Sequence, residues 1–400
     1  MTHRERMLAT IRGESTDQIP WVPRMDLWCI AQRARGILPK QFVGLNTAQI
    51  ADVLDVACHS VRGDFTLQRE PRELALLGFG IENHPDFPYR VELRGLPMEF
   101  RQEGDSSYTR ICTSAGDIEI NLNLTHEMRR EGISMPFTKQ FPIRSEANFD
   151  AIGEIYEHLE VIPTPEAYES FHKRLGHRGL AIANGMVGAS PMHTIFHDLV
   201  SQEQFFYLYA DEREGLERLA RRMEPFFEKV LGTVMRCNAE VVFWGCNYDQ
   251  DLTWPAFFKD QIAPWLKKAA DRAHAAGKFL LTHTDGENQK LLPLYPPCSF
   301  DVAESVCPKP MTRCSLKEVR EGMGPKITVF GGLCSVAFLK DSMNDAAFES
   351  YLDQTLAETG TGERVIFGVS DMVPPDADMK RLERIKERVR SFGPVRPKSL

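Results

Sequence analysis

The stretch KFLLTHTDG, residues 278–286, shows the pattern that decides the fold. Its apolar letters FLL stop abruptly, and His283, Asp285 and Gly286 follow them. A short apolar run that does not alternate with polar residues, and that ends in glycine, is typical of a parallel strand covered on both faces. The end of this strand is therefore expected to carry either a pair of metal ligands or only a polar turn.

Similar apolar runs recur along the chain, and amphipathic helical patterns separate them. Strands are predicted at 19–22, 180–185, 240–245, 278–283, 300–305, 326–332 and 364–370, with a weaker one at 59–63, and helices at 208–236, 255–276, 316–322, 346–358 and 376–392. This many alternating units favour a closed barrel over an open sheet. We therefore predict an α/β protein, a (β/α)8 TIM barrel forming a single domain over residues 1–400.

Residues 89–124 break this rhythm, because apolar and polar residues alternate there around the turn sequences EGDSS and SAGD. Alternation of this kind, interrupted by glycine-containing turns, predicts antiparallel hairpins. We expect a β insertion in the same domain that either roofs the active site or forms an interface.

Charge and composition exclude several classes of function. Lys and Arg number 48 against 56 Asp and Glu, for a net charge of −8, so nucleic acid is not an expected partner. No apolar run approaches the roughly 18 residues of a membrane-spanning helix. The amino-terminal segment also has no long apolar signal region, so we expect a cytoplasmic protein. The 9 cysteines form no CxxC pair, and any metal must be held by dispersed ligands.

Three ligand-type side chains, His283, Glu304 and Cys334, close successive predicted strands. Functional residues of such barrels lie at the carboxyl ends of the strands, and neighbouring strands are only about 4.8 Å apart. Imidazole, carboxylate and thiolate all bind zinc, and three protein ligands with an open position form the catalytic pattern. The structural alternative is that Glu304 pairs with Lys or Arg, Cys334 packs as a small apolar group, and His283 is hydrogen-bonded.

Polar residues also stand at other predicted strand ends. Their side chains are expected to bind polar groups of a substrate, to transfer protons, or to orient His283. Catalytic roles are predicted for Asn247, Asp249 and Asp371, and substrate-binding roles for Arg24, Asp26, Tyr248 and Met186. His193 and His197 share a helix face, but no nearby acid completes a familiar metal motif, so we expect them on the surface or in packing.

Nearly the whole chain resembles the uroporphyrinogen decarboxylase superfamily, nearer its corrinoid-linked, zinc-dependent methyltransferase branch. The similar stretches are MTHRERMLATIRGESTDQIPWVPRMD (1–26), GMVGASPMHTIFHDLVSQEQFFYLYADEREGLERLARRM (185–223), AHAAGKFLLTHTDGENQKLL (273–292), FDVAES (300–305), SLKEVREGMGPKITVFGGLCS (315–335) and FGVSDMVPPDADMKRLERIKE (367–387). The resemblance implies the TIM-barrel fold and methyltransferase chemistry.

In that branch a histidine and a cysteine of an H-x-C…C pattern hold zinc, often with a glutamate. Carried over, this implies the ligands His283, Glu304 and Cys334, with Asp285 where the family has its other cysteine. Aspartate is a harder zinc ligand than thiolate. The resemblance therefore leaves two ligand sets: all four residues, or three with Asp285 turned away.

The function implied is transfer of a methyl group from a small methylated compound, such as an O-methyl ether, to a corrinoid or to tetrahydrofolate, with zinc activating the substrate. No D-x-H-x-x-G corrinoid signature occurs in the chain, so a corrinoid is expected on a separate partner protein. The alternative is metal-free decarboxylation of a uroporphyrinogen-like carboxylated substrate, bound by Arg24, Arg33 or Arg35. A catalytically silent subunit of a larger assembly is a further alternative function. Among assemblies, a homodimer is considered.

Overall fold

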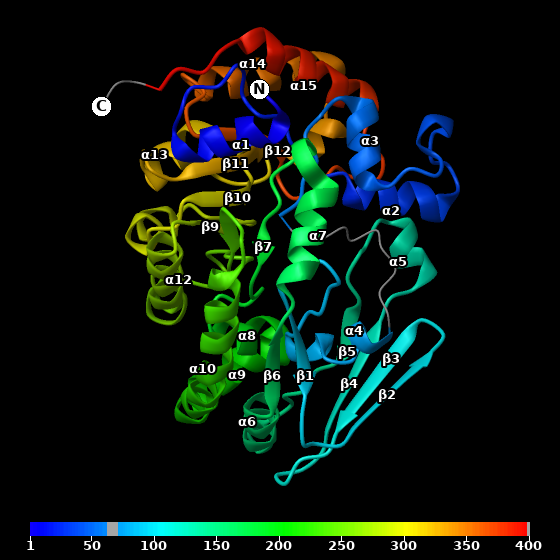
Figure 1. The fold of residues 1–400 in the computed structure, drawn as a ribbon, viewed down its shortest axis with the longest axis vertical. Helices are drawn as coiled ribbons and strands as arrows, with labels where there is room; N and C mark the ends of the chain where they lie inside the picture. The colour runs from blue at the N-terminus through cyan, green and yellow to red at the C-terminus, as the bar shows by residue number, and fades with distance from the viewer. Residues whose placement is uncertain (62–70, 398–400) are drawn as a thin grey trace.

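The computed structural model describes residues 1–61 and 71–397. Its centre is a parallel sheet of six strands in the spatial order β12-β11-β10-β9-β8-β7 (Figure 1). The strands are β7 (Ala183–Asn184), β8 (Val241–Phe243), β9 (Phe279–His283), β10 (Val302–Val306), β11 (Thr328–Leu333) and β12 (Val365–Val369). Each was predicted from its apolar run, and all are buried except the two ends of β9, Phe279 and His283, which are partly exposed. The mixed α/β class is therefore confirmed.

The predicted strand at 19–22 is wrong as a full strand, because only Trp21 forms a β-bridge, to Phe367 of β12. The local sequence is IPWVP. Both prolines lack an N–H, so the segment has too few donors for a continuous ladder.

Backbone hydrogen bonds nevertheless lead on from β12 toward β7: Val22 N to Phe367 O (2.8 Å), Ala57 N to Trp21 O (3.1 Å) and Cys58 N to Arg178 O (2.9 Å). The weaker strand predicted at 59–63 forms no strand over 59–61, and residues 62 and 63 lie outside the described residues. A closed eight-stranded barrel stays a prediction.

Helices surround the parallel sheet, and α12 packs against β9. The longer ones are α1 (His3–Arg12), α2 (Asp26–Arg35), α3 (Thr47–Leu54), α6 (Phe149–Glu157), α7 (Pro165–Leu175), α9 (Gln202–Asp211), α10 (Arg213–Arg236), α12 (Ala263–Ala275), α13 (Leu316–Met323), α14 (Asp345–Glu358) and α15 (Met379–Phe392). In the described part of the chain, no helix combines the length and apolarity needed to cross a bilayer.

Two of the predicted helices are divided. The helix expected at 208–236 is two helices, α9 and α10. The one expected at 255–276 consists of α11 (Pro255–Phe257), a π-helical turn (Phe258–Ile262) and α12. Pro264, the second residue of α12, has no N–H to donate to the preceding turn, which explains the wider hydrogen-bonding pattern there.

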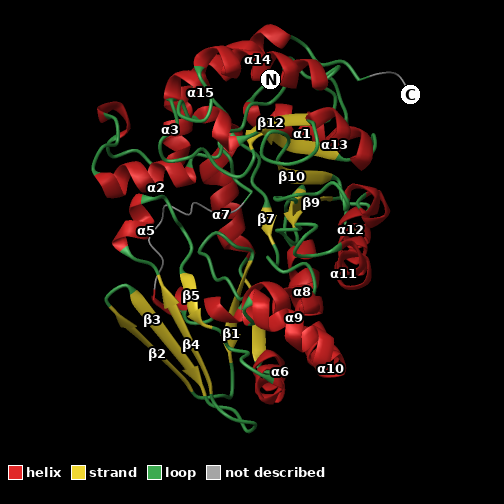
Figure 2. Cartoon of the chain, turned by 180° about the vertical axis from the view of Figure 1, so that it is seen from behind, coloured by secondary structure: helices red, strands yellow, loops and turns green. Residues whose placement is uncertain are grey.

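The antiparallel insertion forms a separate sheet beside the parallel one (Figure 2). Its strands are β2 (Met98–Glu103), β3 (Ser106–Ile111), β4 (Ile118–Asn123) and β5 (Phe137–Gln140). The turns fall at EGDSS and SAGD, as predicted, with Gly104 and Asp105 between β2 and β3. Antiparallel structure extends past residue 124, however, because β1 (Tyr89–Leu93) pairs with β6 (Leu159–Pro163) and not with β2.

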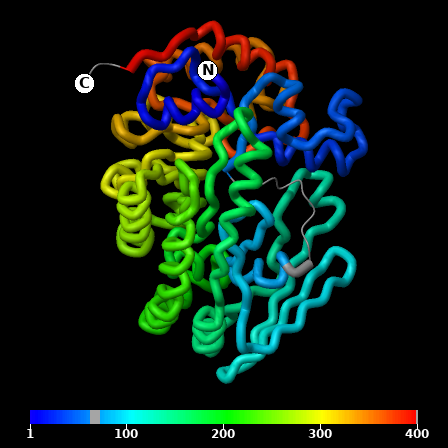
Figure 3. The backbone as a smooth tube through the Cα atoms, viewed as in Figure 1, coloured from blue at the N-terminus to red at the C-terminus, as the bar shows by residue number. Residues whose placement is uncertain are grey.

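Both ends of the described chain lie on the side of the molecule where α1, α14 and α15 pack (Figure 3). A β-bridge between Thr16 and Val395 joins them. The segments that follow α1 and α15 are thereby joined, and Arg364, just before β12, donates to the carbonyl of Ile11 in α1 at 2.8 Å, which places α1 at the amino-terminal end of β12.

The parallel sheet carries a bulge in β10, where the register with β11 shifts between Glu304 and Val306. Gly331 of β11 faces this bulge with φ of 137°. A Cβ atom there would lie 2.6 Å from both the backbone N and the backbone O of Val306. The close approach of the two strands therefore requires glycine at this position.

Replacement of Gly331 by alanine is expected to lower the free energy of unfolding by about 3 kcal/mol or more, through the backbone clash and the strained φ. Gly277→Ala is the matched control: φ is 68° but no atom lies within 4 Å of the added Cβ, so about 1 kcal/mol is expected. Urea unfolding of both variants measures the difference. Equal losses would contradict the role given to the close approach.

Candidate active site

A cavity of about 460 Å³ lies at the carboxyl ends of the parallel strands. Residues on the strand side include Arg24, His59, His283, Glu304 and Asp371. Ser134 to Pro136 and Thr138, at the start of β5, also line it from the antiparallel sheet. They lie outside residues 89–124, so the roof predicted for that segment stays a prediction. A larger hollow of about 660 Å³ between α13 and α14 lies among surface helices; its described lining has charged side chains such as Lys317, Arg320 and Glu321 but no histidine.

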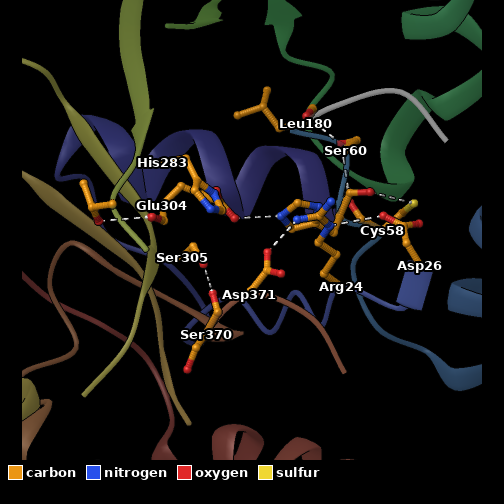
Figure 4. A network of polar contacts seen from close by, with 12 residues as sticks. Arg24, Asp26, Cys58, Ser60, Leu180, His283, Glu304, Ser305, Ser370 and Asp371 are labelled. Atoms are coloured by element: carbon orange, nitrogen blue, oxygen red, sulfur yellow. Dashed lines mark hydrogen bonds and ion pairs between the residues drawn. The ribbon is translucent and has the colours of Figure 1, made fainter. Parts of the chain in front are cut away.

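Glu304 is the centre of the polar network in the cavity wall (Figure 4). It is 2% exposed. One carboxylate oxygen lies 2.5 Å from Nδ1 of His283, and the other lies 3.0 Å from Nε2 of His59. Both oxygens of a buried carboxylate are thus engaged by imidazole rings, an arrangement that offsets the cost of its burial.

Burial alone would raise the pKa of Glu304, but the charge and hydrogen bond of His283, with His59, outweigh it, and the pKa is lowered far below its usual range. Burial alone would lower the pKa of His283, but the Glu304 carboxylate raises it above its ordinary value. The pair therefore favours an ionised glutamate beside a protonated histidine.

The backbone of β10 fixes the direction of Glu304. Ser305 has φ of 64°, a left-handed conformation that is uncommon for a residue other than glycine. Its hydroxyl donates to the carbonyl of Ser370, and the Ser370 hydroxyl donates to the carbonyl of Leu333 at 2.8 Å. These bonds tie the ends of β10, β11 and β12 together and hold the bulge that sets Glu304 between the two histidines.

A second ion-pair network lies beside the first. Arg24 donates to Asp371 at 2.8 Å and to Asp26 at 3.2 Å. Burial alone would lower the pKa of Arg24, but the charges of Asp371 and Asp26 raise it. Arg24 therefore stays positively charged. Asp285 also lines the cavity, and its burial raises its pKa above the ordinary value.

The structure brings together six of the predicted site residues in the cavity lining: Arg24, Asn247, His283, Asp285, Glu304 and Asp371. Five others are not among the described residues that line it: Asp26, Met186, Tyr248, Asp249 and Cys334. Tyr248 is buried in the core with its hydroxyl 2.9 Å from that of Thr282.

Asp249, a predicted catalytic residue, binds backbone groups of two neighbouring loops. Its two oxygens accept hydrogen bonds from the backbone N–H groups of Asp251 (2.8 Å) and Glu287 (2.9 Å). It thereby joins the loop after β8 to the loop after β9, which is the behaviour of a turn-stabilising aspartate.

The four predicted zinc ligands do not fit one metal ion in the arrangement observed. Within residues 1–61 and 71–397, no three His, Cys, Asp or Glu side chains are grouped so as to hold an ion. Glu304 gives both oxygens to histidines. Cys334 is fully buried, and its backbone N–H donates to the hydroxyl oxygen of Tyr351 at 2.8 Å. Zinc binding therefore stays a prediction of the resemblance.

His59 and His197 are the cavity residues that the sequence analysis missed as functional groups. His59 begins the segment 59–63, whose strand pattern was weak. His197 was assigned to the surface or to packing, because no acid completed a motif with His193. The acid beside His197 is its neighbour Asp198, with Oδ1 at 2.9 Å from Nδ1, and the HD pair at 197–198 was the available signal.

No protein-family model and no curated protein matches the sequence. Among solved structures, the chain is similar to a methyltransferase from Methanosarcina mazei, with a TM-score of 0.53 over 98% of this chain and 99% of that chain. The two sequences are 13% identical. At this identity the likeness shows a shared fold, extending over the full length of both chains.

Replacement of Glu304 by glutamine is expected to destabilise the protein more near neutral pH than at alkaline pH. The depressed pKa of Glu304 stabilises the fold above about pH 4.5, and the raised pKa of His283 stabilises it until pH rises through that pKa. At about pH 6 both contributions are present, so loss of the carboxylate should cost about 3 kcal/mol or more.

Urea unfolding at about pH 6 and about pH 10 measures this difference, which should shrink at the higher pH as His283 loses its charge. The control is His274→Gln, because His274 forms a more exposed pair with Asp301 at 2.9 Å and should change stability little at either pH. A Glu304→Gln loss that is independent of pH would contradict the ion-pair assignment.

Proposed function

We propose that the protein is an enzyme that transfers a methyl group from a small methylated compound to a corrinoid or to tetrahydrofolate. The observation that carries the proposal is the cavity at the carboxyl ends of the parallel strands, where buried charged groups converge in a fold shared with a methyltransferase. Perturbed carboxylates and histidines that meet in a cavity are the usual sign of an active site. The sequence resemblance supports the same chemistry.

The size and lining of the cavity support a small substrate with polar groups. Its volume of about 460 Å³ is at the lower end of the range for ligand sites. Arg24 and Asp371 are placed to bind polar groups of the substrate, and Asn247 offers an amide on the facing wall. We propose that Glu304 keeps His283 in a fixed orientation toward the substrate.

A corrinoid acceptor would come from a separate protein, because the chain has no corrinoid signature. We further propose that the parallel strands and the segments around Trp21 and Ala57 form the wall of a closed (β/α)8 barrel. The hydrogen bonds from β12 through these segments to Arg178 support this proposal.

The decarboxylase alternative required Arg24, Arg33 or Arg35 to bind the carboxylates of the substrate, and the contacts of these arginines give it little support. Arg33 donates to the carbonyl of Leu45, and Arg35 pairs with Asp376 and Glu131. Of the three candidate arginines, only Arg24 is among the described residues lining the cavity. A single arginine with two acidic partners is a poor site for a polycarboxylate.

The proposal predicts transfer of a ¹³C-methyl label from one of a set of donors (methanol, methylamine, 2-methoxyphenol or chloromethane) to cob(I)alamin or tetrahydrofolate, followed by NMR. Arg24→Met should lower kcat/KM by on the order of 100-fold, because substrate positioning is lost. His274→Gln, outside the cavity, should retain activity. Absence of transfer from every donor to either acceptor would refute the proposal.

The resemblance also predicts about one zinc per chain in protein purified without chelators. His283→Ala and Cys334→Ala should each lose the metal, which elemental analysis of the purified proteins measures. Retention of zinc in Cys334→Ala would contradict the carried-over ligand set and fit the position of Cys334 away from the cavity lining. Metal-free protein with full activity would contradict the zinc prediction altogether.

A further inference from the structure

A second histidine–carboxylate pair, separate from Glu304, stands in the cavity wall. His197 and Asp198 both line the cavity, with side chains 27% and 20% exposed. They lie in the π-helical turn Ile195–Leu199, which follows the short helix α8 (Pro191–Thr194). Such wide turns are rare in proteins and are frequent at functional sites.

The His197 ring is held at both nitrogens. Nδ1 lies 2.9 Å from Oδ1 of Asp198, and Nε2 lies 3.0 Å from the side-chain nitrogen of Asn247. An ionised carboxylate only accepts hydrogen bonds, so Asp198 keeps a proton on Nδ1 and leaves Nε2 as the atom that exchanges protons. This is the way a buried aspartate orients a catalytic histidine.

Asn247 connects this pair to the Glu304 network. Asn247 has φ of 57°, and its backbone N–H donates to the carbonyl of His283 at 3.1 Å. Its left-handed backbone is thus anchored to the end of β9 while its amide reaches His197. In the free protein, this amide holds the place beside Nε2 that an oxygen atom of a ligand would take.

The second oxygen of Asp198, Oδ2, is buried and has no hydrogen-bond partner among the described residues. Gly80, which also lines the cavity, leaves room beside it, since a Cβ at Gly80 would lie 3.0 Å from Oδ2. A buried carboxylate oxygen without a partner is costly. Its retention points to a role for the charge of Asp198 beyond packing.

His193 is not placed to exchange a proton with a ligand in the cavity. It is fully buried, its Nδ1 accepts the backbone N–H of Ala189 at 3.1 Å, and it does not appear among the described residues of the cavity lining. Burial, together with the nearby His197, lowers its pKa well below the usual range. His193 therefore stays neutral, and its ring centroid lies 5.8 Å from that of His197.

We propose that His197, oriented by Asp198, donates a proton to the departing oxygen of an O-methyl substrate. This inference rests on the proposed function and names the substrate class as methyl ethers or methanol. Asp198 is the positioning residue of the pair. The oxygen binds beside Nε2, in place of the Asn247 amide.

Methyl transfer and proton transfer are coupled in this step. The carbon–oxygen bond breaks as the methyl carbon bonds to the acceptor nucleophile, a reduced corrinoid or the amine of a folate, and the electron pair of the broken bond stays on oxygen. When the acceptor is the folate amine, its N–H proton is released to water once the nitrogen–carbon bond has formed. The Nε2 proton of protonated His197 moves to that oxygen, so the product leaves as a hydroxyl compound. Water returns a proton to His197, and Asp198 remains ionised throughout.

The first test needs no substrate. In protein labelled with ¹⁵N-histidine, long-range ¹H–¹⁵N spectra should show neutral His197 with its proton on Nδ1, the signal being assigned by its absence in His197→Gln. Asp198→Ala should shift the proton toward Nε2, whereas the control His274→Gln should leave the His197 signals unchanged. A proton on Nε2 in the unmodified protein, or no response to Asp198→Ala, would overturn the pairing.

The second test uses the leaving group as a readout that a merely structural role would not move. The probes are 2-methoxyphenol, a poor leaving group that needs a proton, and 4-nitroanisole, which needs little help. His197→Gln should lower kcat for 2-methoxyphenol by on the order of 100-fold with KM nearly unchanged, and for 4-nitroanisole by only about threefold or less. Asp198→Asn should follow the same pattern with a smaller loss, of about tenfold.

Equal losses with the two ethers would overturn the proton-donor role. Transfer from methylamine or chloromethane alone, with no oxygen donor used, would overturn the substrate class while leaving the proposed function standing. If no methyl donor is turned over, the proposed function fails together with the proton-donor role, and the tautomer measurement still decides whether Asp198 orients His197.

Discussion

A carboxylate buried between two imidazole rings is the interaction on which the candidate site depends. Glu304 is almost fully shielded from solvent, and its charge is balanced by His283 and His59, which come from different segments of the wall. Each partner restrains the others, and the ends of three neighbouring strands are held in register around them. Removing one member would leave a buried charge without compensation, which is far costlier than losing a hydrogen bond at the surface.

The cavity has two polar walls that are linked in the free protein. One contains Glu304 and its histidines, and the other contains His197 and Asp198. Asn247 joins the walls, because its backbone follows the end of β9 while its side chain reaches His197. Residues far apart in the sequence are thereby linked across the cavity, and the proposed function would require such preorganisation.

The sequence was sufficient to predict the elements that depend on local pattern. The apolar runs that became β8 to β12, and the turns around Gly104 and in SAGD, were predicted correctly. The segment IPWVP was over-predicted as a strand, because its apolar character was given more weight than its missing N–H donors. Asp285, a predicted metal ligand that follows β9, lines the cavity, and its role as a ligand stays a prediction.

Side-chain direction and tertiary partners could not be read in the same way. Tyr248 and Asp249 follow Asn247 in the sequence. Tyr248 is nevertheless buried in the core, and Asp249 stabilises a turn. The chain turns away from the cavity after Asn247, which has a left-handed backbone. This conformation was not predicted from the sequence. Likewise, His59 became recognisable as part of the site only through its contact with Glu304, which is distant in the sequence.

The roof and the wall of the cavity belong to different sheets. Ser134 to Pro136 and Thr138 enter from the antiparallel sheet, whose strands pair among themselves and, in the described part of the chain, share no ladder with the parallel strands. Substitutions in this roof can alter the shape of the cavity while the buried charges beneath it keep their partners. Substitutions in the roof can therefore change substrate preference during evolution, because the roof is separate from the buried charged residues whose loss would unfold the protein.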